Sequence, residues 1–141
     1  MADNEMTCSE YAAEWLSVAD MDLQSAEFLL QMRPIPIEII CYHCQQAAEK
    51  MFKAYLVING ADPPKIHGLD TLYRLCEPFI QNKKDIWDEI DDLNQYSIIP
   101  RYPHELEISE QTAKNAIANT KTIAAYIKPL CNQGTDNKDD R

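Results

Sequence analysis

The segment from Cys41 to Leu56 constrains the fold of this chain most strongly. Pro36 precedes it and Asn59-Gly60 follows it. Proline suits the first turn of a helix and Asn-Gly suits its end, so these signals predict a helix over residues 37–58. Its apolar side chains occupy a wide arc at about 100° per residue. A wide arc indicates a helix at the centre of a bundle, or one that partly faces another subunit.

The polar side of this helix carries the first candidate binding residues. They are His43, Gln46, Lys50 and Lys53. These side chains fall within an arc of about 80°, because residues three and four apart are neighbours on a helix. A ring, an amide and two cations could bind a phosphate or an acidic partner. The alternative is an ordinary solvated face with ion pairs such as Glu49 with Lys53.

Hydrophobic periodicity predicts two further long helices and two short ones. Thr7 and Glu10 form a capping-box pattern at the start of the first helix, which should end near Met32 because Pro34 follows. The remaining helices should begin near residues 68, 85 and 109, with the last one ending near residue 129. Three long and about two short helices make an all-α, up-and-down bundle.

The chain of 141 residues suits one domain, and its three glycines are too few for an all-β fold. We expect a flexible N-terminus over residues 1–6, a helical bundle over residues 7–131 and a disordered tail over residues 132–141. No apolar run reaches the roughly 18 residues of a membrane span, and no secretory signal is present. The sequence therefore predicts a cytoplasmic protein that does not enter a membrane.

Charge and cysteine usage limit the function. The formal net charge of −10 disfavours general nucleic-acid binding, so an RNA ligand would need a small basic patch. Cys41 and Cys44 form a C-x-x-C pattern, which is typical of zinc or redox sites. No second C-x-x-C and no H-x-x-x-H completes a metal site. We therefore interpret these cysteines as small core residues and expect no metal and no cofactor.

Two further segments carry candidate binding groups. Lys65 and His67 lie in the loop after the central helix, where binding groups concentrate, although His67 could instead cap the next helix. Arg101, Tyr102 and His104 lie in a proline-bracketed turn. A guanidinium on a stiff turn suits a phosphate or carboxylate, and a histidine can transfer protons near neutral pH. Arg101 could equally anchor the turn to an acidic helix face.

The motifs together resemble the HEPN domain (higher eukaryotes and prokaryotes nucleotide-binding). The matching segments are His43-Cys44-Gln45-Gln46-Ala47-Ala48-Glu49-Lys50, Lys65-Ile66-His67-Gly68-Leu69 and Arg101-Tyr102-Pro103, within roughly residues 9–128. The resemblance implies an all-α bundle that usually forms a homodimer. It also implies a metal-independent ribonuclease toxin, neutralised by a minimal nucleotidyltransferase. Such enzymes use an Arg-x(4–6)-His motif, whereas only two residues separate Arg101 from His104.

Three functions follow. The leading hypothesis is a HEPN-type module that binds a nucleotide, a minimal nucleotidyltransferase or both, within a toxin–antitoxin-like pair. Its binding residues would be those of the central helix and of the Lys65 and Arg101 segments. The second is a ribonuclease that uses Arg101 and His104 as catalytic residues, in which histidine takes the 2′-hydroxyl proton and arginine stabilises the phosphorane. The third is a dimeric interaction module without a small ligand.

Overall fold

In the computed structural model of the chain, the described residues are 6–97 and 108–139, with side chains described through residue 132. All regular elements in these ranges are helical, so the predicted all-α class is confirmed. The long helices are α1 (Cys8–Leu29), α2 (Ile37–Ile58) and α5 (Glu110–Asp139), and the short ones are α3 (Leu69–Cys76) and α4 (Trp87–Asn94). A 3₁₀ turn, η2 (Glu77–Phe79), follows α3. No helix among the described residues is long and apolar enough to cross a bilayer.

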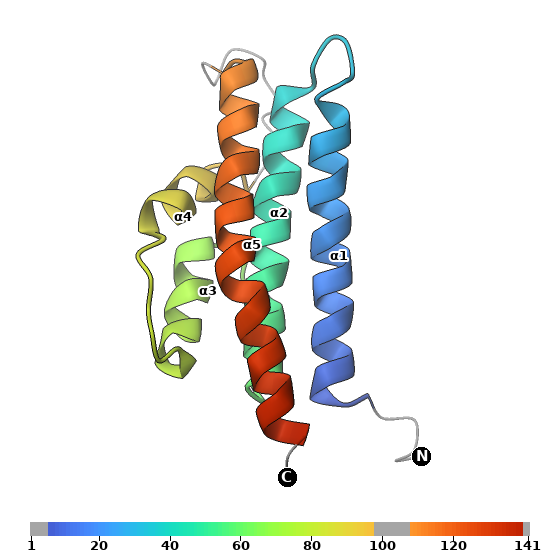
Figure 1. The fold of residues 1–141 in the computed structure, drawn as a ribbon. Helices are drawn as coiled ribbons and strands as arrows, with labels where there is room; N and C mark the ends of the chain where they lie inside the picture. The colour runs from blue at the N-terminus through green and yellow to red at the C-terminus, as the bar shows by residue number, and fades with distance from the viewer. Residues whose placement is uncertain (1–5, 98–107, 140–141) are drawn as a thin grey trace.

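Helix α2 lies at the centre of the bundle and contacts α1, α3, α4 and α5 (Figure 1). It runs antiparallel to α1, as the short connection predicts, and in the same direction as α5. Every side chain from Met51 to Ile58 is buried. The wide apolar arc of α2 is thus covered by helices of this chain. The alternative that it faces another subunit is wrong for these positions.

Helix α1 lies at the edge of the bundle and is fully buried along one stripe only (Figure 1). The buried residues Ala12, Ala19 and Ala26 recur every seven positions. Small side chains at a helix contact allow the two axes to approach closely, because the interaxial distance depends on the side chains between them. Larger neighbours such as Leu16 and Leu23 pack against the core with part of their surface exposed.

Caps place the helix boundaries close to the predicted positions. The backbone N–H of Glu10 donates to Thr7 Oγ1 at 3.1 Å, and the backbone N–H of Thr7 donates to Glu10 Oε1 at 3.3 Å, which confirms the capping box. Gly60 follows α2 with φ of 84°, a conformation that glycine adopts without strain. Helix α1 ends at Leu29, earlier than predicted, because residues 30–32 bond three positions back in a tighter turn.

Helix α5 differs most from the prediction. It continues past Pro129 to Asp139, whereas the sequence predicted an end near Pro129 and a disordered tail over residues 132–141. An internal proline removes one backbone hydrogen bond and crowds the preceding turn. Ile127 and Cys131, on either side of Pro129, are buried in the core. Their packing offsets the local loss, so the helix is not interrupted.

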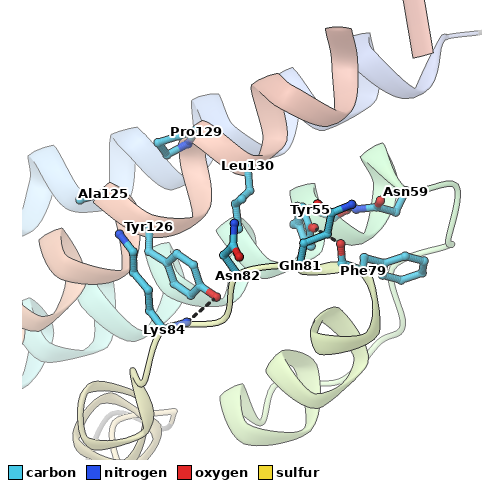
Figure 2. Close-up of a pocket in the computed structure, with 10 residues that line it drawn as sticks. All are labelled: Tyr55, Asn59, Phe79, Gln81, Asn82, Lys84, Ala125, Tyr126, Pro129 and Leu130. Atoms are coloured by element: carbon cyan, nitrogen blue, oxygen red, sulfur yellow. Dashed lines mark hydrogen bonds between the residues drawn. The ribbon is translucent and has the colours of Figure 1, made fainter. Parts of the chain in front are cut away.

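The segment between α3 and α4 is fixed to α2 and α5 (Figure 2). The hydroxyl of Tyr55 donates to the carbonyl oxygen of Phe79 at 3.0 Å, and the backbone N–H of Lys84 donates to the hydroxyl of Tyr126 at 3.1 Å. The Nζ atom of Lys84 lies 5.5 Å from the centroid of the Tyr126 ring. These contacts frame a hollow of about 420 Å³ that none of the predicted binding residues lines.

Candidate functional site

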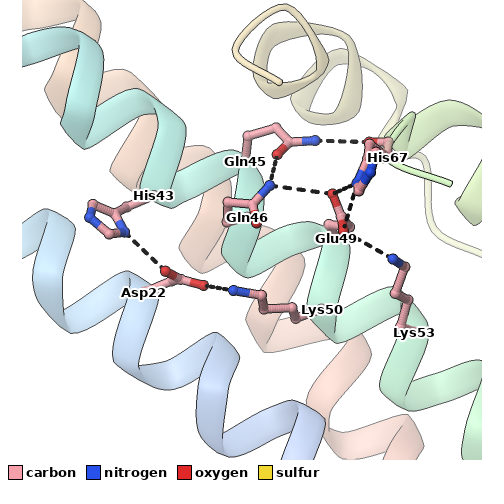
Figure 3. Close-up of polar contacts among 8 residues, drawn as sticks. All are labelled: Asp22, His43, Gln45, Gln46, Glu49, Lys50, Lys53 and His67. Atoms are coloured by element: carbon pink, nitrogen blue, oxygen red, sulfur yellow. Dashed lines mark hydrogen bonds and ion pairs between the residues drawn. The ribbon is translucent and has the colours of Figure 1, made fainter. Parts of the chain in front are cut away.

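Polar side chains along α2 form a cluster of two adjacent networks, one of which reaches α1 and the other the loop before α3 (Figure 3). This α2 cluster consists of Asp22, His43, Gln45, Gln46, Glu49, Lys50, Lys53 and His67. Two carboxylates organise it, Asp22 from α1 and Glu49 from α2 itself. Each of them contacts two basic side chains, so the cluster has two halves.

The Asp22 half links α1 to α2. The Nδ1 atom of His43 lies 2.9 Å from Oδ1 of Asp22, and the Nζ atom of Lys50 donates to Oδ2 at 2.6 Å. The side chain of Asp22 is 13% exposed and that of Lys50 is 20% exposed. Partial burial strengthens such a pair relative to one on an open surface. Lys50 therefore tethers two helices and does not present an unpaired cation to a ligand.

The Glu49 half is more deeply buried. The Nζ atom of Lys53 donates to Oε2 of Glu49 at 3.0 Å, with only 7% and 5% of these side chains exposed. The predicted Glu49–Lys53 ion pair is confirmed, but the expected solvated face is wrong here. Further polar contacts offset the cost of burying a charge pair. Gln46 Nε2 donates to Glu49 Oε1 at 3.4 Å, and Nδ1 of His67 lies 3.3 Å from both carboxylate oxygens.

His67 is held by its main chain and by its ring. Gln45, which is fully buried, donates from Nε2 to the carbonyl oxygen of His67 at 2.9 Å and accepts from Gln46 Nε2 at 2.8 Å. The ring faces Glu49, yet 72% of the His67 side chain is exposed. His67 thus projects from a buried network into solvent. The backbone before it places Lys65, also exposed, in the same loop.

Of the nine predicted residues, five belong to the α2 cluster, Lys65 lies exposed in the adjoining loop, and three are undecided. His43, Gln46, Lys50, Lys53 and His67 are all members of the α2 cluster. Arg101, Tyr102 and His104 lie outside the described residues. The catalytic role of Arg101 and His104 therefore stays a prediction.

Sequence reasoning missed two members of the cluster, Asp22 and Gln45. A signal for each was present. Asp22 lies within the inward apolar stripe of α1, between Ala19 and Ala26. Gln45 is next to Cys44 in the apolar arc of α2. A polar side chain within an apolar stripe requires a buried partner, since an unpaired one is costly.

Cys41 and Cys44 belong to the core, as predicted. Their residues are 1% and 0% exposed. Burial raises the pKa of both thiols to about 12, which disfavours the thiolate that metal binding and redox chemistry require. Among the described residues, no group of three or more His, Cys, Asp or Glu is arranged to hold a metal ion.

The family model of the HEPN domain matches residues 12–130, a range that contains the whole α2 cluster. The chain belongs to the HEPN family. A curated relative from Methanocaldococcus jannaschii, named "Putative toxin MJ1304", is 28% identical to this HEPN chain over 138 residues. The match covers 84% of this chain and 87% of that protein.

Two solved structures share the HEPN fold of this chain. The protein TT1696 from Thermus thermophilus superposes with a TM-score of 0.73 at 22% identity, covering 84% of this chain and 97% of that one. ST0689, described as an archaeal HEPN homologue, gives a TM-score of 0.67 at 23% identity, with coverages of 85% and 97%. These likenesses establish the helical architecture.

Proposed function

We propose that this HEPN chain is a toxin-like module that binds a nucleotide at the surface formed by Gln46, Lys65 and His67. The observation that carries the proposal is the exposed ring of His67, which is braced by buried Glu49 at 3.3 Å. When Nδ1 donates its proton to Glu49, Nε2 is left to accept a proton, or to donate one to a phosphate oxygen once protonated.

The local charge balance supports a phosphate-bearing ligand. Lys53 compensates Glu49, and Lys50 compensates Asp22, so both halves of the α2 cluster are close to neutral. Lys65 then adds a positive charge at the surface of a chain whose net charge is −10, and His67 adds a ring nitrogen that can hydrogen-bond to a ligand. Loops on a rigid scaffold are where binding groups concentrate. The ligand contacts therefore shift from the buried lysines of α2 to this loop.

Calorimetric titration with ATP tests the proposal. We expect binding that weakens at least about fivefold in His67→Ala and in Lys65→Ala, because each variant removes one charge-assisted contact. Both side chains are exposed, so the fold should persist. Lys114→Ala is the matched control, since Lys114 is an exposed lysine on α5. No heat at millimolar ATP, or equal affinity in all four proteins, would refute nucleotide binding. Lys50→Ala is unsuitable because it would also break the contact with Asp22.

RNA cleavage is the second candidate function, and the same pairing favours it. A carboxylate that orients a histidine is a common arrangement for proton transfer. The curated relative is named as a toxin, which is consistent with a reactive HEPN module. Incubation with cellular RNA tests this function in the parent and in His67→Ala, Arg101→Ala and His104→Ala. Cleavage that survives all three changes would exclude these residues from the reaction.

A minimal nucleotidyltransferase partner and a homodimer remain proposals that the family membership supports. Co-expression followed by affinity purification tests the partner. Light scattering on the purified chain tests the dimer. A strict monomer at high concentration would exclude any mechanism in which two subunits share a site.

A further inference from the structure

The outer side of α1 exposes a row of large apolar side chains. This α1 outer stripe consists of Tyr11, Val18, Met21, Phe28 and Met32. The fractions exposed are 39%, 47%, 62%, 71% and 53%, in that order. The residues are spaced alternately by seven and by three or four positions; Met32 lies in the turn just after α1, and the other four lie about 80–180° around the helix from the buried alanines. Scattered exposed apolar residues are normal, whereas a continuous row indicates an interaction surface.

Two hollows lie along this stripe. The first has a volume of about 230 Å³ and is lined by Tyr11, Glu14, Trp15 and Val18. The second has a volume of about 400 Å³ and is lined by Met21, Gln24, Ser25, Phe28, Leu29 and His43. Their centres lie roughly ten residues apart along α1, which corresponds to about 15 Å. If a second helix packed along the stripe, its side chains three turns apart would reach both hollows.

The charged side chains of α1 itself have one sign. Helix α1 contains Glu10, Glu14, Asp20, Asp22 and Glu27 and no lysine or arginine. Asp20 and Glu27 pair with Lys128 and Lys121 of α5 across exposed contacts of 2.8 and 2.9 Å. Glu14, which lines the first hollow, makes no ion pair with any described residue. The net charge of the whole chain, with these residues included, is −10.

We propose that the α1 outer stripe is the docking surface for a cationic amphipathic helix of another protein. A row with steps of seven, and of three or four, is the repeat with which one helix packs along another. Glu14 beside the row and the net charge of −10 favour lysine and arginine on the flanks of that helix. A second copy of α1 would place carboxylates against carboxylates. An anionic lipid surface would be repelled for the same reason.

The inference is independent of nucleotide binding, because neither Lys65 nor His67 lies on this face. A homodimer would then use another surface. His43 connects the stripe to the α2 cluster, since it lines the second hollow and contacts Asp22. A docked helix would therefore cover one edge of the Asp22 half.

Two synthetic peptides test the proposal. One has about three heptads with leucine at the two core positions and lysine on the flanks. The other is identical except that glutamate replaces every lysine. We expect fluorescence anisotropy to show binding of the lysine peptide to the intact chain. The glutamate peptide should bind at least about tenfold more weakly. Equal binding of both peptides, or no binding of the lysine peptide, overturns the proposal.

Variants separate docking from general attraction to an acidic protein. The double variant Met21→Gln and Phe28→Gln keeps the net charge and should weaken binding of the lysine peptide at least about tenfold. The double variant Leu75→Gln and Phe79→Gln is the control, because both residues are apolar and 43% exposed elsewhere on the surface. Equal loss in the two variants overturns the proposal. So does a dimer, detected by light scattering, that dissociates only in the first variant.

Discussion

Helices α1 and α2 have the same length, 22 residues, and pack against each other, yet they bury their side chains in opposite ways. Helix α2 is surrounded and buries large residues such as Phe52. Helix α1 buries alanines and exposes large residues such as Phe28. Position in the bundle, not hydrophobicity alone, decides which apolar side chains enter the core. The inversion on α1 indicates that its large residues serve contacts outside this chain.

The largest difference between the two helices should appear when a phenylalanine is truncated on each. Phe52 is 0% exposed, so Phe52→Ala should lower the free energy of unfolding by about 3–5 kcal/mol through lost burial and a cavity. Phe28 is 71% exposed, so Phe28→Ala should change it by less than about 0.5 kcal/mol. Urea denaturation monitored by circular dichroism measures both. Similar losses would mean that α1 is not an edge helix.

A second test enlarges an alanine on each side of α1. Ala19 is 0% exposed against α2, so Ala19→Leu should destabilise the chain by about 1–3 kcal/mol through overpacking. Ala13 is exposed on the same helix, and Ala13→Leu should be nearly neutral. Urea midpoints at constant slope distinguish the two outcomes. A tolerated Ala19→Leu would show that α1 does not approach α2 as closely as the structure indicates.

Ion pairs between the helices should contribute less to the free energy of unfolding than the packing of the buried alanines of α1. Asp22→Asn keeps the shape of the side chain but leaves Lys50 without its carboxylate, which should cost about 1–2 kcal/mol. Asp20→Asn, which removes an exposed pair with Lys128, should cost less than about 0.5 kcal/mol. Thermal or urea unfolding at low and high salt provides the measurement. An equal effect of the two substitutions would contradict the buried character of the Asp22 contact.

The smallest effect on the free energy of unfolding concerns the buried thiol of Cys44 on α2. Burial raises the pKa of Cys44 from 9.0 to about 12, so its contribution is present below pH 9 and is lost as pH rises from 9 to about 12. At pH 9.5 the loss should be about 0.8 kcal/mol for this thiol, because the unfolded state releases its proton first. Cys44→Ala should reduce the pH dependence of the free energy of unfolding by that amount. Urea denaturation at pH 7 and at pH 9.5 under reducing conditions measures how much the free energy of unfolding of each protein changes between the two pH values.

Local signals predicted most of the fold. The bounds of α2, the capping box of Thr7 and the starts of α3 and α4 followed from residues close together in the sequence. Pro129 was misread because its neighbours in space, not its neighbours in sequence, stabilise the helix around it.

The candidate site was predicted only in part. A helical projection places Lys50 and Lys53 on one side of α2. It cannot show that Asp22, on α1, pairs with Lys50. The α1 outer stripe was not predicted, because the inward apolar stripe of the first helix already accounts for its helical periodicity. Contacts between residues far apart in the chain require the folded structure, and these contacts decide whether a lysine is a ligand group or a tether.

The row of buried alanines on α1 has a mechanical consequence for this helix. The buried side chains of Ala12, Ala19 and Ala26 are short, so they interlock with the neighbouring helix less deeply than large side chains would. Asp22, which contacts His43 and Lys50 two turns apart on α2, helps to fix the axial position of α1. Under a pulling force directed along α1, this carboxylate would bear part of the shear, together with the ion pairs of Asp20 and Glu27. A protein bound to the outer side could then move α1 lengthwise without opening the core, provided that it first released Asp22.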